Sequence, residues 1–478
     1  MKKLVVAGLS ALIAGTLLTG CMKMEDSIII NSDGSCTLSG EISIEKDTLF
    51  KTYADITGGS SGPVKEAVVK SALEKQGFVP VTIDDKDYYK ISTSKTSGAE
   101  SNKCDNIADF YRYLSKNLAG MLHQNEDNVV SLSETSVVLR MPANLNIIQD
   151  MLKSTASADD TGNTGGTANA VLDMADNEKI LESLKDAIIT YNVTFPAKIE
   201  EVSSNVTLSE DGKTMSVSFP VITDKVYDEY AYCENDIAAE GALNGVTYNK
   251  TVTVSLPEGT TATLNGSPVT NNRIDCKKTG TYNFKLSDGR TTETLCFIVD
   301  KSAPVIARQK DSGKLEFSDF DNGQDTVLGK GYIAVYDPEG GIKEIKADGT
   351  NVLQSTFQNI DENKDKNSLV SSYFVYSLDI KNFKEGRHSI KASDNFGNVS
   401  TKKFIVDKTK PLIKGIKDGK TYNKAVTIKF SDKNGIKSAK LNGKTVKTGV
   451  KASKKGTYTL KVTDNAGNVQ KVKFTIKK

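Results

Sequence analysis

The sequence predicts a multidomain protein in which an N-terminal α+β domain is followed by three small all-β sandwiches. Three observations lead to this prediction. The chain has 478 residues, more than a single hydrophobic core usually organises. Its C-terminal half repeats a block of strand-like segments, and its N-terminal half mixes helical with strand-like periodicity.

The C-terminal repeat consists of matching stretches in which apolar and polar residues alternate. Such alternation is typical of half-buried strands. Asn-Gly pairs lie between them and supply the positive φ that tight hairpins need. Several short strands with regular turns in about 65 residues predict a β-sandwich. The matching stretches are VTYNKTVTV (246–254) with KTYNKAVTI (420–428), ATLNGSPV (262–269) with AKLNGKTV (439–446), and GTYNFKLSD (280–288) with GRHSIKASD (386–394) and GTYTLKVTD (456–464).

The last two blocks end in the pattern G-x-Y/H-x-h-x-h-x-D-x-x-G-N, where h is apolar. This ending resembles that of bacterial immunoglobulin-like surface domains, and the resemblance covers about residues 242–478. The first block departs from the pattern, with Gly289-Arg290-Thr291 at the turn. The resemblance implies immunoglobulin-like sandwiches that serve as spacers or adhesive units. The expected domains span 242–303, 304–409 and 410–478.

The N-terminal half contains both strand and helix patterns. A stretch rich in Ser, Thr, Asp, Gly and Asn at 153–170 is expected to be a flexible insertion. The helix is predicted from an apolar face formed by Ile107, Phe110, Tyr111, Leu114 and Leu118. Strands are predicted at 27–31, 36–44, 129–141, 188–195 and 206–219, and a further helix at 64–75.

Two segments of this half carry a second resemblance. DSIIINSDGSCTLSGEISI (26–44) and TYNVTFPAKIEEVSSNVTLSEDGKTMSVSFP (190–220) resemble the opening and closing parts of the LppM-like domain of bacterial lipoproteins. We assign this domain to residues 21–241. The resemblance implies an α+β fold that has been linked to lipid or glycolipid interaction.

The first 20 residues resemble a bacterial lipoprotein signal peptide. Lys2 and Lys3 precede a short apolar run, which ends in Leu18-Thr19-Gly20-Cys21. The resemblance implies lipid attachment at Cys21 and a mature protein outside the cytoplasmic membrane, anchored by its lipid. An ordinary signal peptide or a transmembrane helix is the alternative, although the run is short for a span of about 20 residues.

Charge is distributed unevenly along the chain. The net charge of +2 combines −17 over residues 22–240, +1 over 241–409 and +16 over 410–478. The basic tail predicts anionic envelope polymers or lipids as partners, and solubility is the alternative explanation of its lysines. The chain has 56 Lys and 6 Arg, which argues against a nucleic-acid reader because base and phosphate recognition favours Arg.

The sequence offers few candidate sites. Cys276 and Cys296 lie in one predicted module, so they are the leading disulfide candidates, although the expected register does not place them opposite each other. Asp319, Asp321 and Asp325 form a weak calcium candidate, for which polar surface turns are the alternative. The oxygen-rich stretch at 361–367 is a similar case.

No catalytic residue and no cofactor is predicted. The chain has two histidines, His123 and His388, in different modules, and none of the common catalytic motifs occurs. We therefore expect a non-enzymatic surface protein with a binding or adhesive role. The alternatives are lipid or glycolipid handling by the N-terminal domain, and an unrecognised hydrolase with facing carboxylates.

Overall fold

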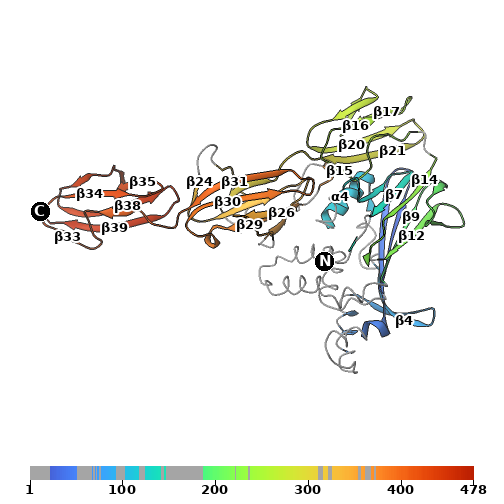
Figure 1. Ribbon diagram of the computed structural model, residues 1–478, viewed down its shortest axis with the longest axis horizontal. Coiled ribbons are helices and arrows are strands. Elements are labelled where there is room, and N and C mark those ends of the chain that lie inside the picture. Colours follow the sequence, from blue (N-terminus) through green and yellow to red (C-terminus); the bar gives the residue numbers. More distant parts are fainter. Residues whose placement is uncertain are drawn as a thin grey trace. The chain divides into compact units, whose positions relative to one another are not determined.

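The computed structural model describes most of residues 22–477 (Figure 1). The described chain divides into two compact units. The first unit comprises Met1–Ser302, Pro338–Gly341 and Asn359–Phe374, and the second comprises Ala303–Asp337, Ile342–Gln358 and Val375–Lys478. The residues outside the description are 1–21, 51–66, 68–69, 72, 75–76, 93–102, 118–123, 142–144, 147–186, 221, 235–236, 311–315, 321–325, 354–356, 361–367, 371–372 and 478.

The N-terminal domain contains two main sheets. The strands predicted at 27–31 and 36–44 are confirmed as β1 and β2, which pair in antiparallel fashion around a turn in which Gly34 has φ +82°. The larger sheet has the order β11-β12-β9-β1-β2-β4-β3, and β5 also pairs with β2. Its strands are β1 (Met22–Ile30), β2 (Cys36–Glu45), β3 (Val79–Ile83), β4 (Lys86–Ser92), β5 (Lys103–Cys104), β9 (Ile188–Thr194), β11 (Thr207–Leu208) and β12 (Thr214–Pro220).

The smaller sheet has the order β10-β14-β7-β6. The predicted segment at 129–141 is thus a pair of strands. Its strands are β6 (Val129–Leu132), β7 (Ser136–Met141), β10 (Ile199–Val202) and β14 (Tyr227–Cys233), and β8 (Leu145–Asn146) pairs separately with β13 (Ile222–Thr223).

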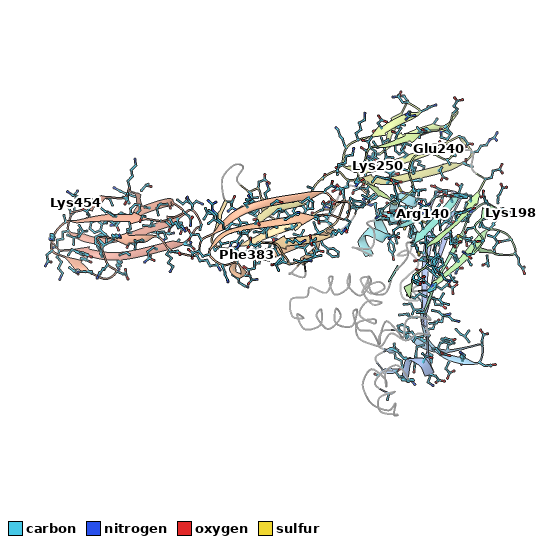
Figure 2. All side chains as sticks on the ribbon, in the orientation of Figure 1. Arg140, Lys198, Glu240, Lys250, Phe383 and Lys454 are labelled. Atoms are coloured by element: carbon cyan, nitrogen blue, oxygen red, sulfur yellow. The ribbon has the colours of Figure 1, made fainter. Side chains whose placement is uncertain are left out.

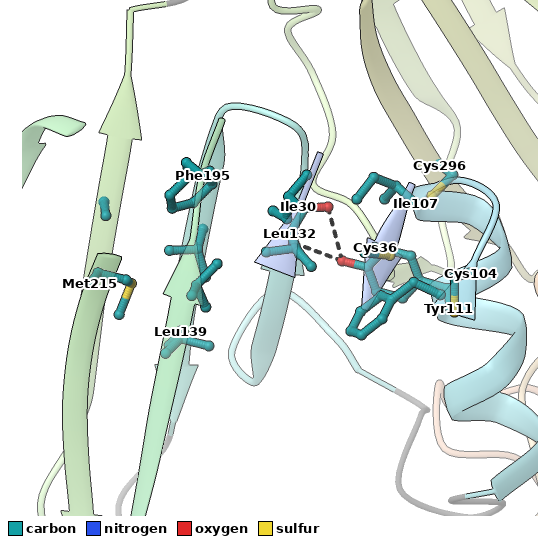
Figure 3. Packing of buried hydrophobic residues seen from close by; sticks show 14 of the residues in the cluster. Ile30, Cys36, Cys104, Ile107, Tyr111, Leu132, Leu139, Phe195, Met215 and Cys296 are labelled. Carbon is teal, nitrogen blue, oxygen red and sulfur yellow. Dashed lines mark hydrogen bonds between the residues drawn. The ribbon is translucent and has the colours of Figure 1, made fainter. Parts of the chain in front are cut away.

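One hydrophobic core lies between these sheets and the helix α4 (Ile107–Asn117). Figure 3 shows its packing around Tyr111, whose hydroxyl accepts a hydrogen bond of 2.8 Å from the Leu132 backbone N–H. Ile107, Phe110 and Tyr111 of α4 are buried, as their helical spacing predicts. Of the predicted face, Leu118 lies outside the described residues, and so does most of the helix predicted at 64–75.

The first module consists of the strands β15 to β21 and packs as two sheets of orders β15-β21-β20-β17-β18 and β16-β19. Its core contains side chains from both sheets, including Val254 of β16 and Phe284 of β20. The bounds are β15 (Thr247–Tyr248), β16 (Val252–Ser255), β17 (Thr261–Leu264), β18 (Ser267–Val269), β19 (Arg273–Cys276), β20 (Gly280–Ser287) and β21 (Thr292–Val299).

The second module consists of β22 to β31, with sheets of orders β23-β22-β25-β29-β28 and β24-β31-β30-β26-β27. Its strands are β22 (Val305–Gln309), β23 (Phe317–Ser318), β24 (Thr326–Leu328), β25 (Tyr332–Tyr336), β26 (Glu344–Ala347), β27 (Thr350–Asn351), β28 (Phe357–Ile360), β29 (Tyr373–Asp379), β30 (Gly386–Ser393) and β31 (Val399–Val406), with the 3-10 helix η2 (Ile380–Asn382) after β29.

The third module consists of β32 to β39, with sheets of orders β32-β34-β37 and β33-β39-β38-β35-β36. Its core joins the two sheets through residues such as Ile428 of β34 and Leu460 of β38. The predicted Asn442-Gly443 turn is confirmed, with φ values of +47° and +81°. The bounds are β32 (Leu412–Lys414), β33 (Thr421–Tyr422), β34 (Val426–Ser431), β35 (Ile436–Leu441), β36 (Lys444–Thr445), β37 (Val450–Ala452), β38 (Gly456–Asp464) and β39 (Val469–Ile476).

The described chain is thus dominated by strands in several separate cores, which confirms the expected all-β sandwiches in its C-terminal half. In all three modules a short early strand pairs in parallel with the last strand, as β15 with β21, β24 with β31 and β33 with β39. Among the described residues, no helix has both the length and the apolar character needed to cross a bilayer.

Candidate functional site

Most of the sequence-predicted site residues are not brought together by the structure. Cys21, Asp321 and Asp325 lie outside the described residues, as do His123 and the stretch 361–367. Asp319 is an exposed residue just after β23. The calcium candidate at 319–325 therefore stays a prediction.

The expected disulfide between Cys276 and Cys296 is not formed in the structure, where both are free, buried thiols. Cys276 lies opposite Val252 in the two-stranded sheet, whereas Cys296 lies opposite Asn283 in the five-stranded sheet. Cys276 packs in the core of the first module, and Cys296 packs in the core of the N-terminal domain. The two side chains therefore point into different cores, which corrects the sequence-based pairing.

The surface of the third module is dominated by lysine. Residues 410–478 contain 19 Lys, no Arg and 3 Asp, and every described lysine among them is exposed. On β34 the burial alternates strictly between buried and exposed, and Lys429 takes one of the outward positions. Figure 2 shows the side chains, with Lys454 labelled on this module. The strand periodicity places the lysines on the solvent side while Val, Ile and Phe fill the core.

Three of these lysines form a row across adjacent strands of the five-stranded sheet. Lys440 of β35 lies opposite Lys461 of β38, and Lys461 lies opposite Lys471 of β39. Directly opposite residues of antiparallel strands have Cβ atoms about 4.5–5.5 Å apart, so their side chains are neighbours. Lys473 is also exposed and lies two residues further along β39. We call Lys440, Lys461 and Lys471 the lysine row.

Few acidic groups balance this charge. Of the three aspartates, Asp418 is exposed, Asp432 is partly buried and Asp464 is fully buried. Within the described part of the chain, no lysine of residues 410–477 forms an ion pair. The outer surface of the third module therefore carries almost exclusively positive charge.

The corresponding row in the other two modules contains fewer lysines. The matching positions follow from the same strand pairing and from the sequence repeat. They are Thr263, Lys285 and Thr294 in the first module, and Lys346, Lys391 and Thr401 in the second.

In the first module this sheet contributes to an interface with the N-terminal domain. The Thr294 backbone N–H and hydroxyl donate hydrogen bonds of 2.8 and 2.7 Å to the buried carboxyl group of Glu134. Burial raises the pKa of Glu134, and the Thr294 hydrogen bonds oppose that rise. Asn244 is buried beside them and donates to the Leu132 and Thr294 carbonyls at 2.9 and 2.8 Å, while its Oδ1 accepts from the Cys296 backbone N–H.

Comparison with known proteins finds sequence similarity over a short stretch of the chain. No protein-family model matches the chain. A stretch of 77 residues is 44% identical to part of the outer cell wall protein of Brevibacillus brevis. The match covers 15% of this chain and 7% of that protein, so the chain spans only a small part of the relative's length.

Solved structures give only weak similarity. A mixed-linkage glucan utilization locus protein, SGBP-B, of Bacteroides ovatus, solved with a mixed-linkage heptasaccharide, aligns at 15% identity and a TM-score of 0.16 over 51% of this chain and 71% of that one. Domains A168–A170 of titin align at 10% identity and a TM-score of 0.22 over 50% of this chain and 98% of that one. Scores of this size do not establish a common arrangement.

Proposed function

We propose that this protein is a non-catalytic, lipid-anchored surface protein that binds anionic polymers of the cell envelope through its third module. The lysine row is the observation that carries this proposal. Like charges directly opposite each other destabilise a sheet by about 0.2–1 kcal/mol per pair. A polyanion lying across the strands would contact the three ammonium groups together and relieve their repulsion.

The composition of the row fits an extended polymer better than a single phosphate group. Lysine is a flexible point charge, whereas bidentate recognition of one phosphate favours arginine, which residues 410–478 lack. The contact would be electrostatic and exposed, with a Debye length of about 8–10 Å near physiological ionic strength. Binding is therefore expected to weaken strongly with salt.

The proposed location is supported by two independent features. The leader with its cysteine at position 21 resembles that of a lipoprotein, and a relative that is 44% identical over 77 residues is named for the outer cell wall. The LppM-like character of the N-terminal domain stays a proposal based on its two resembling segments.

Lipid handling and hydrolysis gain no specific support from the described residues. The core of the N-terminal domain contains the buried aromatic side chains of Phe110, Phe195 and Phe219 in one hydrophobic cluster. We therefore develop only the envelope-binding proposal.

Binding of the full chain to isolated cell walls that carry polyol-phosphate polymers tests the proposal. Changing Lys440, Lys461 and Lys471 together to Gln should weaken binding at least about fivefold at low salt, because three adjacent contacts are lost. The control changes Lys424, Lys447 and Lys454 to Gln, which removes the same charge from exposed positions outside the row.

Co-sedimentation at about 0.05 and about 0.5 M salt gives the affinities and their salt dependence. Equal weakening by both triple variants would show that only net charge matters. Absence of binding by the unchanged protein at low salt would remove the proposal and leave the lysines as solubility residues.

The lipid anchor has its own test. Cys21→Ser should shift the protein from the detergent phase to the aqueous phase in a detergent partition, because lipid attachment needs the thiol. Equal partitioning of both proteins would contradict lipid anchoring at this residue.

A further inference from the structure

We propose that Asp407, Asp432 and Asp464 form a calcium site at the junction of the second and third modules. The three residues each place a carboxylate oxygen within 4.8 Å of the others. Asp407 directly follows β31, the last strand of the second module, whereas Asp432 follows β34 and Asp464 ends β38 of the third. The site would therefore join the linker to the third module.

Asp464 supplies the second observation that points to a cation. Its side chain is fully buried, and its Oδ1 accepts a 2.7 Å hydrogen bond from the Asn468 backbone N–H. Its Oδ2 is also buried and has no hydrogen-bond partner. Burying an unpartnered carboxylate oxygen costs several kcal/mol unless a cation or a donor compensates it.

The equivalent turn of the second module differs from this turn in the hydrogen bonds of its asparagine. There, Asn398 donates from Nδ2 to Asp394 Oδ2 at 2.8 Å, so the turn satisfies its own carboxylate. In the third module the matching Asn468 donates instead to the backbone carbonyls of Asp407 and Thr409 at 2.8 and 3.1 Å. The Asn468 side chain is thus hydrogen-bonded to the linker, and Asp464 Oδ2 can bind a cation instead.

The surrounding charges also favour a cation. Asp407 Oδ2 accepts from Asn434 Nδ2 at 2.9 Å, and Asp432 Oδ1 accepts from the Asn434 backbone N–H at 2.8 Å. In the described residues no lysine or arginine forms an ion pair with any of the three aspartates, although the module is rich in lysine. The neighbouring carboxylates add to the effect of burial in raising the pKa of Asp432.

The geometry suits calcium. Calcium binds oxygen ligands at about 2.3–2.6 Å, so two ligands of one ion lie at most about 5.2 Å apart, and the observed 4.8 Å limit falls within this range. Water can complete the six to eight ligands that calcium takes. Three carboxylates at this junction are expected to give a dissociation constant of about 10⁻⁴–10⁻³ M, as in extracellular modules.

Calcium titration of the full chain by isothermal titration calorimetry, after removal of divalent ions by a chelator, tests this site. Asp464→Asn and Asp432→Asn should each remove one binding event per chain or weaken it more than about tenfold, because a charged ligand is lost. Asp418→Asn is the control, since it makes the same change at an exposed residue whose Oδ1 accepts from the Lys473 backbone N–H.

Circular dichroism without calcium shows whether the variants fold. If Asp464→Asn fails to fold, Asp432→Asn still tests the site. Unchanged calcium binding by a folded Asp432→Asn or Asp464→Asn variant would overturn the proposal. Equal affinity for magnesium would overturn the assignment to calcium.

A separate observation identifies a modification site in the N-terminal domain. We infer that Cys36 and Cys104 form a disulfide in the exported protein, an inference that rests on the proposed location outside the cytoplasm. The two residues are direct partners across the antiparallel pair β2 and β5, and both are buried in the same core (Figure 3). Such partners have Cα atoms about 4.5–5.5 Å apart, within the range that a disulfide bridges.

The chemistry requires an external oxidant. The two thiols of the structure would lose two protons and two electrons as the S–S bond forms, and a disulfide of a thiol oxidoreductase would accept the electrons and become two thiols. A hydrogen bond from the Cys36 thiol lowers the pKa of Cys104, which favours Cys104 as the attacking thiolate.

Alkylation of the protein recovered from the envelope fraction, under denaturing conditions and with mass spectrometry, tests this inference. Cys36 and Cys104 should resist alkylation until a reductant is added, while Cys276 and Cys296 react without it. Cys36→Ser should make Cys104 reactive. Full alkylation of both residues without reductant would overturn the disulfide, and recovery of the protein only from the cytoplasm would instead remove the proposed location.

Discussion

The five-stranded sheets of the first and third modules share one strand order, but the two modules use the same row of this sheet in opposite ways. In the first module the row ends at Thr294, which is buried against Glu134 of the N-terminal domain. In the third module it ends at Lys471, which is exposed beside Lys461. The repeat thus fixes the sandwich, and a few outward positions decide whether its face is an internal interface or a charged surface.

The difference extends to how buried polar groups are satisfied. Asn244 and Glu134 in the first unit are bonded to protein donors and acceptors. Asp464 in the second unit keeps a buried oxygen without a partner. An interface completed by the chain itself should be rigid under all ionic conditions, whereas one completed by a cation should respond to its concentration.

The largest effect is expected from Asn244→Ala, which breaks the interface of the first module. Three buried backbone groups each lose a hydrogen bond, at about 1–3 kcal/mol each, so the free energy of unfolding should fall by about 3–5 kcal/mol. Urea unfolding followed by circular dichroism measures it. Asn125→Ala is the control, because the side chain of this exposed asparagine also accepts from two backbone N–H groups, which water can satisfy. An equal loss in both variants would contradict the role of burial.

The second largest effect is expected when Thr294 of the first module is changed to lysine, the residue at the matching position of the third module. Thr294→Lys should destabilise the protein by about 2–3 kcal/mol, because the longer side chain overfills a buried position and the hydroxyl hydrogen bond to Glu134 is lost. Thr401→Lys makes the same change at the exposed matching position of the second module and should cost less than about 1 kcal/mol. Thermal melts measure the loss of stability in both variants. An equal loss in the two would contradict the role of Thr294 in the interface.

Glu134→Gln should have a smaller effect that depends on pH. Because burial raises the pKa of Glu134 in the folded protein, its contribution to stability is full below the unfolded value of about 4.3 and declines as pH rises through the folded value. Glutamine does not titrate. The variant should therefore lose about 1 kcal/mol near pH 4 and less at pH 7. Urea melts at both pH values measure this, and a loss that grows with pH would contradict it.

The smallest effect is a gain in stability from Lys471→Thr. The change shortens the lysine row to the pattern of the second module and removes the repulsion with Lys461, which should add about 0.5 kcal/mol at low salt. The gain should disappear at high salt because exposed charges are screened. A stabilisation that persists in high salt would instead indicate a packing or propensity effect.

Local features of the fold were predictable from the sequence. The Asn-Gly turns, the alternating strands of the repeat and the face of α4 depend on neighbouring residues. The turns and strands are confirmed, and so is the α4 face at Ile107, Phe110 and Tyr111. The parallel pairing of β1 with β9 was not predicted, since it joins segments more than 150 residues apart and no local pattern encodes their register.

The sites were harder to predict for the same reason. Alternation along each strand shows that Lys440, Lys461 and Lys471 point outward, but only the register places them in one row. Asp407, Asp432 and Asp464 belong to three separate loops or strand ends, and the available signal was the repeated Asp-x-x-Gly-Asn turn. The pairing of Cys276 with Cys296 was wrong because sharing a module does not imply sharing a sheet.

The parallel pairing of β33 with β39 has a mechanical consequence. Two backbone hydrogen bonds of 3.0 Å, from Thr475 to Lys420 and from Lys477 to Tyr422, flank this pairing. Because the strands run in the same direction, tension applied at the two ends of the module pulls them in opposite senses along their axes. The bonds then bear the load in shear and must fail together, whereas an antiparallel end pair would open one bond at a time. A force applied along β33 and β39 would thus be resisted by a pairing of only two residues, Thr421 and Tyr422, with β39.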